Sequence, residues 1–140
     1  MRTLTLLLLL SPALFAQQPS SVRPVATVMQ LHQAMMGPVS DAVFNAGSQP
    51  PKDDKAWGEV LNQALILAES GNLLMLGSRA KDQGDWMNMS RALVDASALA
   101  VKAAQEKNAA ALNDAGDRIE STCESCHQHY RDHGRSMMSK

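Results

Sequence analysis

The stretch from 108 to 130 reads NAAALNDAGDRIESTCESCHQHY, and its apolar residues recur every three or four positions. This spacing places them on one face of an α-helix and leaves polar residues on the other faces. Asn108 precedes the pattern and Gly134 follows it, as residues that begin and end helices commonly do. The stretch therefore predicts a helix whose apolar face consists of Leu112, Ala115, Ile119, Cys123, Cys126 and Tyr130.

Three more helices are predicted before it. The first runs from Val25 to about Ala46, with a kink at Pro38 because proline removes a backbone donor. The second begins after Asp53 or Asp54 and ends near residues 77–78, and the third follows a turn and cap at 82–85 and ends near Lys107. The predicted apolar faces are Val28, Met35, Val39 and Ala42 in the first helix; Trp57, Leu61, Ala64, Leu65, Ala68 and Leu74 or Met75 in the second; and Trp86, Met89, Leu93, Ala96 and Ala100 in the third.

The composition agrees with a helical protein of one domain. The chain has 140 residues, and Ala, Leu and Met outweigh β-branched and aromatic residues, which argues against a β-sandwich or barrel. Four helices with one apolar stripe each predict an all-α, antiparallel up-and-down four-helix bundle. The net charge of −1 offers no basic face for nucleic acid, which is excluded as a partner.

The N-terminus resembles an export signal. Residues 1–16 have a charged start, a Leu-rich middle and a small-residue end at Ala16, which is typical of a cleaved signal peptide. The alternative, a membrane anchor, needs about 20 apolar residues, and Pro12 interrupts a shorter run here. We therefore expect a periplasmic protein with a signal peptide at 1–16, a tether at 17–24, the bundle at 25–135 and a flexible tail at 136–140.

The two cysteines of the chain both lie in Cys123-Glu124-Ser125-Cys126-His127, a C-x-x-C-H motif. This motif is the signature of covalent c-type haem attachment, with Cys123 and Cys126 forming thioethers and His127 binding the iron as proximal ligand. It predicts one covalent haem c. A disulfide or redox pair is one alternative, although redox C-x-x-C motifs accompany βαβ folds. A zinc site is the other, built from both cysteines and two of His127, His129 and His133.

The layout of the chain, with the motif continued as Cys126-His127-Gln128-His129-Tyr130-Arg131, resembles the cytochrome c′ family of class II c-type cytochromes. The resemblance implies haem attachment at Cys123 and Cys126, His127 as axial ligand, and Arg131 as the basic residue beside the haem. One position departs from the family pattern. Val28 stands four residues before His32, where family members often carry an arginine for a haem propionate.

The resemblance also implies that the first helix faces the distal side of the haem. His32 and Met35 share the expected inward face of that helix, and Met29 and Met36 lie on its flanks, so His32 or Met35 is the expected sixth ligand. Such a ligand indicates an electron carrier that meets redox partner proteins. Without it, five-coordinate iron would suit small gases such as NO or CO.

Two further expectations concern activity and assembly. No nucleophile and base are combined in the sequence, so we expect no enzymatic turnover, and a haem-free helical adaptor is the remote alternative. Charges are scarce in the first two helices, with Asp41 alone between residues 25 and 46. Because exposed helix faces normally carry charges, we expect a homodimer through these helices, which the resemblance also implies.

Overall fold

The computed structural model describes residues 22–132, and every regular element within that range is helical. The predicted signal peptide at 1–16, most of the predicted tether, His133, the predicted helix end at Gly134 and the predicted tail at 136–140 lie outside the described residues. In the described range, no helix has both the length and the apolar character needed to cross a membrane.

The four predicted helices are confirmed. The first is a continuous helix made of α1 (Val28–Leu31), the π-helical turn η1 (His32–Met36) and α2 (Gly37–Ser48). The others are α3 (Asp54–Leu74), α4 (Asp85–Gln105) and α5 (Ala109–Cys126), and α5 continues into the π-helical turn η3 (His127–Asp132). A short 3-10 turn, η2 (Gly77–Arg79), lies between α3 and α4.

Side chains that accept backbone N–H bonds fix where these helices begin. Thr27 and Gln30 form a reciprocal capping box at α1. Asp53 accepts a hydrogen bond of 2.8 Å from the Ala56 N–H, and Asn108 accepts one of 3.0 Å from the Ala111 N–H. The predicted beginnings of α3 and α5 at Asp53 and Asn108 are thus confirmed, because each cap satisfies a donor that the helix cannot.

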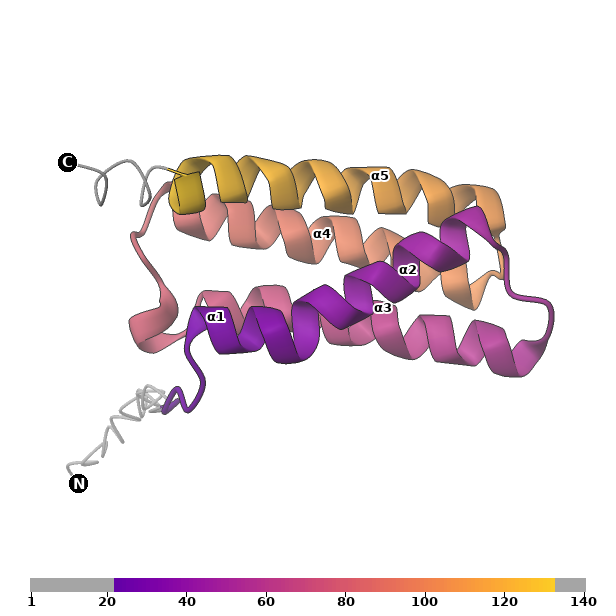
Figure 1. Ribbon diagram of the computed structural model, residues 1–140, viewed down its shortest axis with the longest axis horizontal. Coiled ribbons are helices and arrows are strands. Elements are labelled where there is room, and N and C mark those ends of the chain that lie inside the picture. The colour runs from indigo at the N-terminus through magenta and orange to yellow at the C-terminus, as the bar shows by residue number, and fades with distance from the viewer. Residues whose placement is uncertain (1–21, 133–140) are drawn as a thin grey trace, which may run out of the picture.

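Figure 1 shows the long helical segments packed side by side. The α2–α3 and α4–α5 connections lie at one end of the molecule, and the α3–α4 connection lies at the other. The N-terminal part of the first helix and the end of α5 share the end that holds the α3–α4 connection. Side chains from α1, η1 and the last turns of α5 are therefore brought to one end of the bundle.

The core confirms the predicted apolar face of α5 and corrects that of α3. Leu112 and Ile119 are fully buried and Ala115 nearly so. In α3 the buried stripe is Trp57, Val60, Ala64, Leu67, Ser70, Gly71 and Leu74. The prediction that Leu65 belongs to this stripe is wrong, because its side chain is 44% exposed. The buried stripe follows alternating steps of three and four residues, which passes over Leu65 to Leu67.

The π-helical turn changes which side of the first helix is buried. Its buried residues are Leu31, Met36, Val39, Val43 and Ala46, so the step from Leu31 to Met36 is five residues instead of three or four. A π-helical turn, with its hydrogen bonds from residue i to i+5, takes up that extra residue. The prediction that Met35 and Ala42 lie on the buried face is therefore wrong, and Met36 and Val43 take their places. The turn ends at Met36, two residues before Pro38, where a split of the helix was predicted.

Candidate cofactor site

Cys123, Cys126 and His127 all line one apolar cavity between the helices. Two cysteines three positions apart lie on the same face of α5, and the helix continues without a break into His127. This inner cavity is small, with a volume of about 50 Å³. Its remaining lining residues are His32, Met36, Ser40, Leu67, Leu74, Met89, Ser90, Leu93 and Thr122.

A second cavity continues the first toward the end of the bundle. This outer cavity has a volume of about 360 Å³ and shares His32, Met36, Leu74, Cys126 and His127 with the inner one. Its other lining residues are Val28, Met29, Lys81, Trp86, Tyr130 and Arg131. The two cavities form one elongated space, and its outer part lies within the range of roughly 300 to 1,000 Å³ that ligand pockets usually have.

The two thiols in this space are held in their neutral form. Burial raises the pKa of the Cys123 thiol to about 11, and the nearby Cys126 and Glu120 add to the rise. Burial also raises the pKa of Cys126. Redox-active cysteines need the opposite, a pKa lowered by positive surroundings. The surroundings of both cysteines therefore argue against the redox-pair alternative.

His32 and His127 face each other across the shared part of the two cavities. Their ring centroids are 5.4 Å apart, and the ring planes are inclined at 52°. His32 begins the π-helical turn of the first helix, and His127 begins the one that follows α5. Two imidazole side chains from separate helices are thus placed in the same apolar space.

The structure places Met36, and not Met35, in this space. Met36 is 9% exposed and lines both cavities, whereas Met35 lines neither. A π-helical turn advances by roughly 80° per residue instead of 100°, so three residues after His32 the side chain has turned about 120° away from it. Four residues after His32 it lies only about 40° away. The sequence signal for this shift is the five-residue step between Leu31 and Met36.

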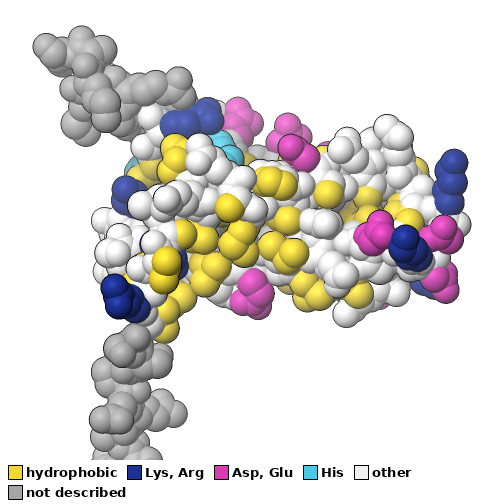
Figure 2. All heavy atoms as spheres, turned by 60° about the horizontal axis from the view of Figure 1, so that its bottom comes forward, with side chains coloured by type: hydrophobic (Ala, Val, Ile, Leu, Met, Phe, Trp, Pro, Cys, Tyr) yellow, Lys and Arg dark blue, Asp and Glu magenta, His cyan; other side chains and the backbone are white. Residues whose placement is uncertain are grey.

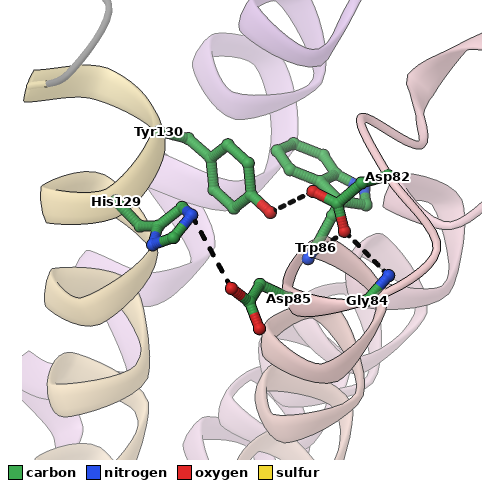
Figure 3. Close-up of polar contacts among 6 residues, drawn as sticks. All are labelled: Asp82, Gly84, Asp85, Trp86, His129 and Tyr130. Atoms are coloured by element: carbon green, nitrogen blue, oxygen red, sulfur yellow. Dashed lines mark hydrogen bonds and ion pairs between the residues drawn. The ribbon is translucent and has the colours of Figure 1, made fainter.

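A polar cluster fastens η3 to the beginning of α4 (Figure 3). The Tyr130 hydroxyl donates a short hydrogen bond to Asp82 Oδ2, while Asp82 Oδ1 accepts from the N–H groups of Gly84 and Trp86 at 2.8 and 3.1 Å. The Tyr130 ring meets the Trp86 ring edge to face, with centroids 4.9 Å apart. His129 Nε2 lies 3.8 Å from Asp85 Oδ2. These contacts hold the turn that carries His127.

The cluster also shifts two pKa values. The hydrogen bond from Tyr130 lowers the pKa of Asp82, and the bonds from the backbone of Trp86 and Gly84 contribute. Desolvation, together with the negative Asp82, raises the pKa of Tyr130 to about 12. Both shifts favour the pair of a neutral phenol and a charged carboxylate, because that pair keeps the hydrogen bond.

Arg131 and Trp86, two residues that the sequence singled out, lie at the outer cavity. Arg131 lines it on the side of η3, and it also borders a surface groove with Glu120, Cys123 and Glu124. Trp86 is buried, and its indole N–H donates a hydrogen bond of 2.8 Å to the Leu74 carbonyl. In the range 22–132, no three His, Cys, Asp or Glu side chains are grouped as a metal ion would need, and His133 lies outside that range.

The comparisons with known proteins bear on the same part of the chain. The family model described as Cytochrome C′ matches residues 80–131, which include the last part of the α3–α4 connection, α4, α5 and all of the C-x-x-C-H motif. No curated protein and no solved structure was found to match the chain. The resemblance to the cytochrome c′ family that the sequence from Cys123 to Arg131 indicated is confirmed over residues 80–131.

Proposed function

We propose that this protein is a periplasmic c-type cytochrome that carries electrons on one covalent haem c, held in the elongated space between the first helix and α5. The observation that carries the proposal is that Cys123, Cys126 and His127 line the same apolar cavity, opposite His32. The alternation of the helix connections in Figure 1 supports an antiparallel up-and-down bundle around it. The haem would supply one-electron exchange at its iron, and we expect no catalytic turnover.

Each residue of the site has a distinct role in this proposal. Cys123 and Cys126 would form the two thioethers that hold the haem. His127 is the proximal ligand, and the polar cluster around Tyr130 holds its turn in place. Apolar side chains such as Leu67, Leu74 and Leu93 exclude water from the site.

We assign the sixth ligand to His32 in preference to Met35. His32 lines both cavities with His127, and Met35 lines neither. Two imidazoles that bind one metal ion from opposite sides, with metal–nitrogen bonds of about 2 Å, have ring centroids roughly 6 Å apart. The observed 5.4 Å between the two ring centroids is within an ångström of that separation, which supports His32 as the partner of His127.

Haem attachment is tested with cysteine variants expressed with the export and haem-attachment machinery. We expect the wild-type protein and the control Ser125→Ala to give about one haem per chain in the pyridine haemochrome assay. The variant Cys123→Ser/Cys126→Ser should lose its haem in denaturing electrophoresis. Haem that stays on the double variant through denaturation would refute attachment through these two cysteines, and a wild-type chain without haem would favour the helical adaptor.

The ligand assignment is tested by the visible spectrum of the ferrous protein. Resolved α and β bands of a low-spin haem are expected for the wild type, for Met35→Ala and for the exposed neighbour Gln33→Ala. His32→Ala should give a high-spin spectrum and bind CO. Retention of the low-spin spectrum by His32→Ala would refute the assignment, and a high-spin spectrum in Met36→Ala alone would transfer the role to Met36.

A second function, binding of NO or CO, is favoured by the uncharged apolar lining of the inner cavity, in which Leu67, Leu74 and Leu93 leave room for a neutral diatomic molecule. This function requires five-coordinate iron. A high-spin ferrous spectrum in the wild-type protein would select it over electron transfer.

We also propose a homodimer through the first helix and α3. Figure 2, which brings the lower side of Figure 1 forward, shows hydrophobic side chains spread over the middle of that side among few charged ones. Met29, Leu65 and Ile66, on α1 and α3, are 61%, 44% and 38% exposed. Contiguous exposed apolar patches mark interaction surfaces, and homo-oligomers most often pair through a symmetric one.

Analytical ultracentrifugation of the haem protein tests the dimer. We expect twice the chain mass at micromolar concentration for the wild type and for Leu99→Gln, a control with similar exposure on α4. Leu65→Gln/Ile66→Gln should give the monomer. A monomeric wild type would refute the proposal and leave this side of the molecule for redox partner proteins.

A further inference from the structure

The two parts of the elongated space differ in charge. The inner cavity is lined by no Lys, Arg, Asp or Glu, whereas the outer cavity is lined by Lys81 and Arg131 and by no carboxylate. An ionised carboxylate is costly to bury in an apolar space without a partner. A ligand with both an apolar and an anionic edge must therefore place its anionic edge in the outer cavity.

The polar cluster explains why these two cations meet at one rim. Lys81 directly precedes Asp82, and Arg131 directly follows Tyr130. The hydrogen bond between Tyr130 and Asp82 (Figure 3) joins two segments that are 48 residues apart. Their neighbours Lys81 and Arg131 line the same outer cavity. Asp82 itself is bonded to Tyr130 and to two backbone N–H groups, so its carboxylate is already engaged by other donors.

We propose that Lys81 and Arg131 form a cationic rim that binds the propionate carboxylates of the haem, with Lys81 serving where Val28 stands in place of the arginine that family members often carry. This inference rests on the proposed function. The thioether edge of the ligand then faces Cys123 in the inner cavity, and the carboxylate edge faces the rim. Lys81 lies in the α3–α4 connection and supplies the rim with a positive charge that the first helix does not provide.

The midpoint reduction potential of the haem-bearing protein tests the role of Lys81. A unit charge about 10 Å from the iron, in a medium between protein and water, changes the ferrous-to-ferric ratio at a fixed applied potential by roughly threefold. Lys81→Gln should therefore lower that ratio by about threefold. Since a tenfold change is 59 mV for one electron, the midpoint potential should fall by about 30 mV. Lys81→Arg keeps the charge and should retain the wild-type potential. The control Lys55→Gln removes a lysine that pairs with Glu59 at the other end of α3 and should also leave the potential unchanged.

Two further readouts separate the possible failures. The shift in Lys81→Gln should shrink at high salt, because an exposed charge is screened over about 10 Å at 0.1 M. Haem content is measured first in every variant by the haemochrome assay. If the wild-type chain binds no haem, the proposed function and this inference both fail. If haem is bound but Lys81→Gln and Lys55→Gln have the same potential, the inference alone is overturned.

Discussion

Two glycines of α3 predict opposite effects of the same substitution. A Cβ added at Gly71 would lie 2.7 Å from Val94 Cγ2, 3.2 Å from the Ser90 carbonyl oxygen and 3.3 Å from the Val94 nitrogen. A Cβ added at Gly58 meets nothing within 4 Å. Gly71 therefore permits the close approach of α3 and α4, whereas Gly58 serves no such purpose.

The magnitudes follow from two opposing terms. Replacing glycine with alanine inside a helix stabilises it by about 1 kcal/mol. Crowding a packed interface costs about 1 to 3 kcal/mol, and at Gly71 two of the three close atoms belong to the backbone of α4, which cannot rotate away. We expect Gly58→Ala to raise the free energy of unfolding by about 1 kcal/mol. Gly71→Ala should lower it by about 1 kcal/mol.

Thermal unfolding of the haem protein, followed by far-ultraviolet circular dichroism, measures the difference. For a domain of this size 1 kcal/mol corresponds to about 4 °C, so the two variants should differ in Tm by about 8 °C. The double variant should lie near the wild type, because the sites are too far apart along α3 to couple. A Tm of Gly71→Ala equal to or above that of Gly58→Ala would show that α4 moves aside at no cost, and it would refute the close-packing argument.

Three other predictions concern the core, the polar cluster and the thioethers. Ile119→Ala, at a fully buried position, should lower the free energy of unfolding in urea by about 3 kcal/mol, against less than about 0.5 kcal/mol for the exposed Leu99→Ala; similar losses in the two variants would contradict this. The Asp82 pKa is lowered from 3.8 and that of Tyr130 is raised to about 12. At pH 7 the free energy of unfolding in urea should therefore be higher for the wild type than for Tyr130→Phe. This difference should shrink as the pH drops below about 4, because Asp82 is then protonated, and as the pH rises from 10 towards 12, because Tyr130 then ionises. A difference that does not vary with pH would assign the effect to packing alone. Cys126→Ser should keep a single thioether, seen as a haemochrome band shifted to longer wavelength; an unshifted band would mean that this cysteine makes no bond.

The helices that sequence predicts best are those in which local rules agree. In α5 an N-cap, a single apolar stripe and the cysteine spacing all indicate one helix, and Asn108, Leu112 and Ile119 have the expected places. The apolar run around Leu65 gave no such agreement, because consecutive apolar residues fit more than one face of a helix. Only packing against α4 decides that Leu67 is buried and Leu65 exposed.

The candidate site was predictable in its covalent part and not in its distal part. The C-x-x-C-H motif is local in sequence, so residues 123–127 could be assigned directly. The distal assignment assumed 3.6 residues per turn throughout the first helix, and the π-helical turn breaks that assumption between Leu31 and Met36. The bond between Tyr130 and Asp82 joins residues far apart in the chain, and no spacing rule indicates such a pair.

The π-helical turn at His32–Met36 is equivalent to one residue inserted into an ordinary helix. Deleting Ala34 would restore α-helical geometry and rotate the preceding residues by about 100° around the helix axis. Val28 and His32 would then leave the cavity, while Val39 and Val43 would keep their places in the core. Ligand contacts and bundle packing thus depend on different stretches of one helix. A change in length by a single residue can consequently alter the distal surroundings of the cofactor during evolution. The core residues that follow the turn would keep their places, and of the buried residues of this helix only Leu31, which precedes the turn, would move.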